Sequence, residues 1–162
     1  MAQFHARVAL GESLAPVGQL RFTQAGPRQF SAFMYDKSWV DDPRAFEIQP
    51  GYSLDSGPFH TSGQAGLSRD ALAGVFADAA PDSWGRRLLE LAYGKGLSEF
   101  EYLTLTDDHC RQGALRFLDD NGAIIRGAAV DAVPRVIDLE TITTIARAYE
   151  QGHDIGHEEM RA

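Results

Sequence analysis

Cysteine and long hydrophobic runs are almost absent from the chain. Cys110 is the only cysteine among 162 residues, which excludes an internal disulfide and a thiolate cluster for zinc or an iron–sulfur centre. No apolar stretch approaches the roughly 18 residues that a membrane-spanning helix needs. Residues 1–7 lack the charged start and long apolar stretch of a secretion signal. We therefore expect a cytoplasmic protein that does not enter a membrane, with Cys110 packed in its interior.

Basic residues are also few. The chain has 15 lysines and arginines against 23 aspartates and glutamates, and its formal net charge is −8. Non-specific binding of nucleic acid needs a basic surface, so we expect no direct nucleic-acid binding by this chain alone. The 44% of hydrophobic and 23% of charged residues are typical of a folded globular protein and exclude collagen, coiled coil and general disorder.

The first part of the chain alternates apolar and polar residues between turn residues, as half-buried strands do. The pattern predicts three antiparallel strands, at His5–Leu10, Val17–Thr23 and Gln29–Tyr35, and a short fourth strand at Arg44–Ile48. The next segment, Gln49–Leu67, has no periodicity and carries four glycines. We predict a long loop there that covers the core, and the alternative is a lid over an active site.

Helical spacing begins after this loop. The pattern predicts one helix from Ser68 to Pro81, a second from Asp82 to Gly94, and a third from Ser98 to Leu105 that begins with a capping box. The second helix has an apolar stripe that we expect to be packed, formed by Trp84, Leu88, Leu91 and Ala92.

Strand patterns return at Gly113–Leu118 and Ala123–Ile125, joined by a turn at Asp120–Gly122, where Asn-Gly favours a hairpin with positive φ at both residues. A linker then leads to a last helix at 138–152. The chain is thus expected to contain a β-rich domain at 1–127, followed at 128–162 by a linker and helix. The predicted fold class is α+β, with a curved antiparallel sheet or partly open β-barrel, inserted helices and a C-terminal helix.

No motif of the sequence provides a complete catalytic or binding site. His153 and His157 have helical metal-ligand spacing, but glycines flank them and the HExxH order is missing. His109–Cys110 is the only adjacent pair of a base and a nucleophile. The acidic pairs Asp107–Asp108 and Asp119–Asp120 fit turns better than acid–base catalysis. We predict no catalytic, cofactor-binding or metal-binding residue in this chain.

The segment Phe76–Leu89 is the most unusual part of the sequence, because a large aromatic residue, a glycine and two arginines follow a helix cap. In one interpretation Trp84 packs under the sheet, the glycine after it allows a close approach, and Arg86 pairs with Glu90. In the other, Arg86 and Arg87, beside Trp84, form an interface for an acidic partner.

Four stretches together resemble the N-terminal part of the HipA family, bacterial serine/threonine kinases that act as toxins of toxin–antitoxin pairs. These stretches are Val17–Phe22, Phe33–Val40, Phe76–Leu89 and Arg111–Phe117. The resemblance implies a non-catalytic N-terminal subdomain that packs on a larger kinase core and faces a helix-turn-helix antitoxin. ATP and Mg are expected only for that core, whose nucleotide-binding lysine, catalytic aspartate and metal-binding aspartate have no counterpart here.

Two explanations of this resemblance stay open. In the first, which the unfinished pattern of residues 153–162 favours, the chain is a segment of a longer kinase. In the second, it is a free-standing small regulator that binds a separately encoded HipA-like kinase. A third hypothesis, from another class, is a small enzyme that uses residues 49–67 as a lid.

Overall fold

A computed structural model of the chain describes residues 2–64, 71–125, 143, 146–147 and 150–151. The chain divides into two units, Met1–Gly127 and Ala128–Ala162. In the second unit, positions 143, 146, 147 and 150 are helical, and the backbone N–H of Gln151 donates to the carbonyl of Arg147 at 3.0 Å. The remainder of the predicted helix at 138–152, the linker before it and the tail after it lie outside the described residues.

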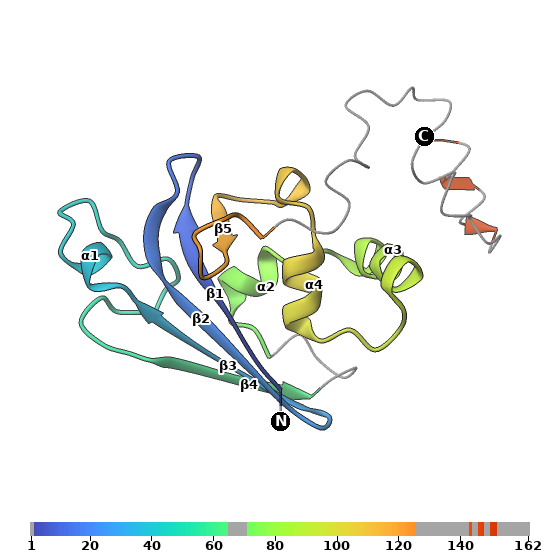
Figure 1. Cartoon of the computed structure of the whole chain (residues 1–162), viewed down its shortest axis with the longest axis horizontal. Coiled ribbons are helices and arrows are strands. Elements are labelled where there is room, and N and C mark those ends of the chain that lie inside the picture. Colours follow the sequence, from blue (N-terminus) through green and yellow to red (C-terminus); the bar gives the residue numbers. More distant parts are fainter. Residues whose placement is uncertain (1, 65–70, 126–142, 144–145, 148–149, 152–162) are drawn as a thin grey trace. The chain divides into compact units, whose positions relative to one another are not determined.

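The first unit is built on one antiparallel sheet. Its strands are β1 (Ala2–Leu10), β2 (Ala15–Ala25), β3 (Arg28–Tyr35), β4 (Phe59–Gln64) and β5 (Leu115–Leu118). They lie in the order β4-β3-β2-β1-β5, so the sheet is open and β4 and β5 form its edges (Figure 1). The first three predicted strands are confirmed, as is the α+β class with a curved antiparallel sheet.

The predicted strand at Arg44–Ile48 is wrong. The carboxylate of Asp42 accepts a hydrogen bond from the backbone N–H of Arg44 at 2.8 Å, which bends the chain, and the N–H of Ile48 donates to the hydroxyl of Tyr35 at 3.0 Å. The fourth strand is β4, inside the segment predicted as a loop, and it pairs with β3. The residues before β4 do cover the core as predicted, since Tyr52 is buried and stacks on Phe59 with ring centroids 4.1 Å apart.

Helices interrupt the strands and pack beside the sheet (Figure 1). They are α1 (Lys37–Val40), α2 (Gly74–Asp78), α3 (Ser83–Tyr93), α4 (Glu99–Leu105) and the 3-10 helix η1 (Asp108–Cys110). The predictions for α3 and α4 are confirmed with their caps, Asp82 and Ser98. The helix predicted from Ser68 is shorter: α2 follows the N-cap Ala73, and Ser68 lies outside the described residues. Among the residues that the structure covers, no helix has the length and apolar character needed to cross a bilayer.

The core lies between the inner face of the sheet and helices α2 and α4. Phe100 of α4 stacks on Phe22 of β2 and on Phe4 of β1, with centroid separations of 5.7 and 5.5 Å. The largest fully buried side chains come from both layers and include Phe22, Phe33, Phe76, Phe117, Leu20 and Leu103. Burial of such side chains contributes about 1.5–3 kcal/mol each to folding, so the packing of α2 and α4 on the sheet stabilises the unit.

Gly18 allows two elements to approach closely inside this core. A Cβ atom at position 18 would lie 2.3 Å from the carbonyl oxygen of Met34 and 2.9 Å from the ring of Phe33. Both distances are below van der Waals contact, and the first involves backbone that cannot move aside. A glycine is therefore required where β2 passes β3 under this ring.

The predicted hairpin after β5 is confirmed, but its turn differs from the prediction. Only Gly122 has positive φ (79°), whereas Asn121 does not. The carboxylate of Asp119 instead accepts from the N–H groups of Asn121 and Ala123, both at 2.9 Å. The returning arm is reduced to a single bridge between Leu118 and Ile124. A side chain thus replaces the second positive-φ residue in holding the turn.

Candidate functional site

The start of α3 is fixed by local contacts in the segment that the sequence singles out. The carboxylate of Asp82 accepts from the N–H of Gly85 at 2.8 Å, which caps the helix. A Cβ atom on Gly85 would lie 2.9 Å from Cβ of Pro81, so the expected close approach is confirmed, although it is to Pro81 and not to the sheet. The carbonyl of Pro81 also accepts from Nε of Arg86 at 3.1 Å.

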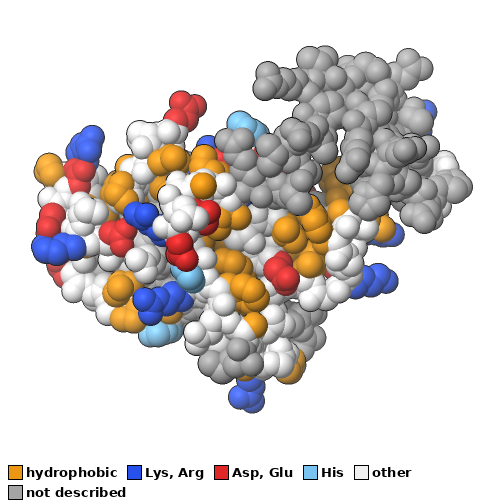
Figure 2. All heavy atoms as spheres, viewed as in Figure 1, with side chains coloured by type: hydrophobic (Ala, Val, Ile, Leu, Met, Phe, Trp, Pro, Cys, Tyr) orange, Lys and Arg blue, Asp and Glu red, His pale blue; other side chains and the backbone are white. Residues whose placement is uncertain are grey.

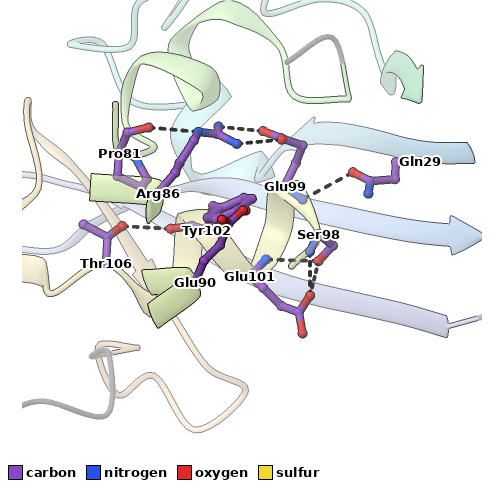
Figure 3. A network of polar contacts seen from close by, with 9 residues as sticks. All are labelled: Gln29, Pro81, Arg86, Glu90, Ser98, Glu99, Glu101, Tyr102 and Thr106. Atoms are coloured by element: carbon purple, nitrogen blue, oxygen red, sulfur yellow. Dashed lines mark hydrogen bonds and ion pairs between the residues drawn. The ribbon is translucent and has the colours of Figure 1, made fainter. Parts of the chain in front are cut away.

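Arg86 joins α3 to α4. Its two terminal nitrogens donate to the two carboxylate oxygens of Glu99 at 2.7 and 2.8 Å, in a fork that matches the carboxylate (Figure 3). The two side chains are only 14% and 10% exposed. The predicted pair of Arg86 with Glu90 is wrong, because Glu90 accepts a hydrogen bond from the hydroxyl of Tyr102 at 2.5 Å instead. The guanidinium lies 4.4 Å from the centroid of the Tyr102 ring, which adds a cation–π contact.

Glu99 is held in place from the other side by α4 and β3. The capping box predicted from Ser98 and Glu101 is present, with the N–H of Ser98 donating to Glu101 at 2.7 Å (Figure 3). The N–H of Glu99 donates to Oε1 of the buried Gln29 on β3 at 3.3 Å. Arg86 therefore binds a carboxylate whose backbone is anchored to the sheet.

Tyr102 has an altered acidity in this network. Burial raises its pKa to about 12, and the hydrogen bond to the Glu90 carboxylate adds to the rise. The hydroxyl is therefore protonated throughout the physiological range and donates to Glu90. Two polar links, Arg86 to Glu99 and Tyr102 to Glu90, thus connect α3 with α4.

The apolar side chains of α3 are not packed as predicted. Trp84 is 49% exposed and Leu91 46%, and α3 has no buried residue. The interpretation that Trp84 packs under the sheet is therefore wrong. Figure 2 shows hydrophobic side chains at the surface in the part of the unit where α3 and α4 lie. The helix is attached through charged and polar groups, and Trp84, Leu91 and Tyr93 are left at the surface.

Arg111 is a buried residue whose role sequence reasoning missed. Its guanidinium donates to the carbonyls of Leu103 at 2.7 Å, Thr106 at 3.0 Å and Ala79 at 3.3 Å, which ties the ends of α4 and α2 together. Burial lowers its pKa, and the neighbouring Asp108, 3.6 Å away, opposes this effect. The only available signal was its position in the stretch Arg111–Phe117, which does not distinguish a buried arginine from a surface one.

Cys110 and the neighbouring loop line a hollow of about 530 Å³ beside the start of α3. Cys110 is exposed, so the expectation of a packed thiol is wrong. Partial desolvation and the nearby Asp107 raise its pKa, which disfavours the nucleophilic thiolate. The hollow is lined by residues 77–82, 84–85, 106 and 110–112. Of the segment 49–67 proposed as a lid, no residue within the described part, 49–64, belongs to this lining.

His5 and His109 contact carboxylates at two separate places in the structure. His5 contacts Asp120 at 2.5 Å, and the carboxylate of Asp107 accepts from the N–H of His109 at 2.7 Å, as expected for a turn. Within the described ranges, no three side chains of histidine, cysteine, aspartate or glutamate are grouped as metal ligands would be. His153 and His157 lie outside those ranges.

The fold defines an α+β domain with an open antiparallel sheet and a helical pair whose outer helix presents hydrophobic residues. Residues 6–118 match the HipA N-terminal domain, and the chain belongs to that family. The match includes all four stretches on which the sequence resemblance rests. No curated protein and no solved structure gave a significant match.

Proposed function

We propose that this domain is the non-catalytic N-terminal segment of a HipA-like serine/threonine kinase toxin, and that it packs on the kinase core and faces a helix-turn-helix antitoxin. Membership of the HipA N-terminal domain family supports the proposal. In it, the domain acts by binding protein surfaces, and phosphoryl transfer belongs to the core, which supplies the ATP and Mg site.

The exposed apolar side chains of α3 are the observation that carries this proposal. Trp84, Leu91 and Tyr93 are each more than a third exposed on a helix whose orientation is fixed. Apolar area removed from water contributes about 25 cal/mol per Å², and Trp is among the residues most enriched at the centres of protein interfaces. A protein surface that covers α3 would remove this exposure.

The charged residues of the segment have different roles in the proposal. Arg86 is a positioning residue, since its guanidinium is bound to Glu99 inside the domain. Arg87 is exposed on the same helix as Trp84, and in the proposal it contacts an acidic group of the partner. The interface would thus combine an aromatic anchor with a cation at its border, as many protein interfaces do.

Co-purification with a kinase core tests the proposal. The core would be taken from the same gene beyond codon 162 or from the adjacent gene, and produced together with this domain. We expect the two to form a complex and the double variant Trp84→Ser/Leu91→Ser to lose it. Phe46→Ser is a matched control, because Phe46 is about as exposed as Trp84 but lies between α1 and β4, away from α3.

Two results would decide against the proposal. If neither gene encodes a HipA-like core, the proposed partner does not exist. If the double variant still forms the complex, α3 is not part of the interface. A reading frame that stops at Ala162 beside a separate core gene would instead identify the domain as a free-standing regulator. ATP hydrolysis or phosphoryl transfer by the domain alone would favour an enzyme.

A further inference from the structure

The strands of the sheet carry an unusual distribution of charge. None of the five strands contains an aspartate or glutamate, although the chain has 23 acidic residues. Side chains alternate between the two faces, and the buried ones of β2 and β3 point toward the core. Arg7, Arg21 and Arg28 occupy the opposite, outer face. The strand residues of this face are therefore basic in a chain whose net charge is −8, although the carboxylate of Asp120 reaches the face at His5.

The outer-face arginines are not neutralised within the described part of the chain. Four other arginines pair with carboxylates at 2.7–3.6 Å: Arg44, Arg86, Arg111 and Arg116. In the described residues, by contrast, no carboxylate lies within ion-pair distance of Arg7, Arg21 or Arg28. His5, beside Arg21 in the sheet, is occupied by Asp120. Three arginines without a carboxylate partner in the described residues thus lie on one surface.

The strand register places apolar side chains around Arg21. Arg21 lies opposite Ala32, and the diagonal neighbours on β3 are Phe30 and Met34. Diagonal neighbours are within reach of long side chains, and the methyl group of Ala32 leaves space between them. Phe30 is 41% and Met34 47% exposed. A cation flanked by two exposed apolar groups is complementary to a carboxylate that has apolar neighbours of its own.

We propose that the outer face of the sheet binds an acidic segment of a partner protein, in which apolar residues separate the carboxylates. Charge complementarity at the arginines and the apolar groups between them support this occupant. A nucleic acid fits less well, because it is a continuous polyanion that would extend beyond the arginines. Its phosphates would then lie within a Debye length, about 10 Å, of the acidic residues on the rest of the surface and be repelled by them. This surface is separate from α3, so the inference does not rest on the proposed kinase partner.

Fluorescence anisotropy with the full chain tests this inference. The probe is a short labelled peptide of alternating glutamate and leucine, compared with a peptide that has lysine in place of glutamate and with a single-stranded oligonucleotide. We expect the acidic peptide to bind best, with an affinity that falls as salt rises. Arg21→Glu/Arg28→Glu should weaken binding by about tenfold or more, because it reverses two charges. Arg44 is an exposed arginine outside the sheet, and Arg44→Glu should change the affinity for the acidic peptide by less than about twofold.

Several outcomes would overturn the inference: no binding of the acidic peptide, an equal loss in Arg44→Glu, or tighter binding of the oligonucleotide. If circular dichroism shows that the double charge variant does not fold, peptide binding by Phe30→Ser is the test of the inference. Weaker binding by this variant supports the inference and unchanged binding overturns it. Trp84→Ser/Leu91→Ser is expected to keep the peptide affinity, which separates this surface from the one on α3.

Discussion

The guanidinium of Arg86 and the carboxylate of Glu99 face each other in a two-point contact that joins consecutive helices of the domain. Both side chains are largely withdrawn from water, so each charge depends on the other for compensation. The orientation of α3, and with it the position of Trp84, therefore depends on this ion pair. Four predictions follow from this and the other buried contacts.

Removal of Glu99 should destabilise the domain strongly. In Glu99→Ala, Arg86 is left without its carboxylate in a site that water reaches poorly, and we expect the free energy of unfolding to fall by about 3 kcal/mol. Urea denaturation measures this change. Asp41→Ala breaks the pair with Lys37, which is exposed on both sides, and should have no measurable effect. Equal losses in the two variants would show that the Arg86–Glu99 contact is no more important than a surface pair.

Two leucines on adjacent helices should differ in their contribution to stability. Leu103 of α4 is fully buried, so Leu103→Ala should lower the free energy of unfolding by about 3 kcal/mol through lost burial and the cavity it leaves. Leu91 of α3 is exposed, and Leu91→Ala should change the free energy of unfolding by less than about 1 kcal/mol. A comparable loss for Leu91→Ala in the isolated domain would mean that α3 packs through its apolar side after all.

Arg111 should be required for folding stability without taking part in binding. Arg111→Met removes the donor for the carbonyls of Leu103 and Thr106, and we expect a loss of about 3 kcal/mol in thermal or urea unfolding. Arg111→Lys should not restore stability, since one ammonium group cannot reach carbonyls spaced for a planar fork. Arg28→Met, on the exposed face of β3, is the control. Full stability of Arg111→Lys would indicate that charge alone matters.

Alkaline pH should destabilise the domain through Tyr102. Its pKa is about 12 in the folded chain against 10.0 when unperturbed, so the folded state holds this proton more tightly than the unfolded state. The resulting stabilisation is complete below pH 10 and is lost as pH rises from 10 to 12. We expect the free energy of unfolding to fall less over this interval in Tyr102→Phe than in the wild type. Tyr93→Phe, on the exposed side of α3, should follow the wild type.

The elements that sequence patterns predicted well are those whose signals are local. β3 alternates buried and exposed residues throughout, β1 and β2 alternate over part of their length, and α4 begins with a capping box. β4 was missed because it is an edge strand of mostly polar residues, and only its pairing with β3 makes it a strand. A six-residue segment of this composition has no periodicity that distinguishes it from a loop.

The candidate site was predictable as a segment but not in its contacts. Helical periodicity located α3 and its apolar stripe, yet periodicity does not say whether a stripe is covered. The partner of Arg86 was sought four residues away at Glu90, whereas the packing of α3 against α4 brings Glu99 to it. The burial of Arg111 likewise depends on contacts with residues 8 and 32 positions away in sequence.

The missing side chain at Gly18 constrains how this domain can be redesigned. Even an alanine there would push against the peptide of Met34, and relief would require β3 to shift away from β2. Such a shift would carry Phe30 and Met34 on one side of the strand and Phe33 on the other. One added methyl group would therefore disturb both the hydrophobic interior and the basic surface, although it changes neither charge nor polarity.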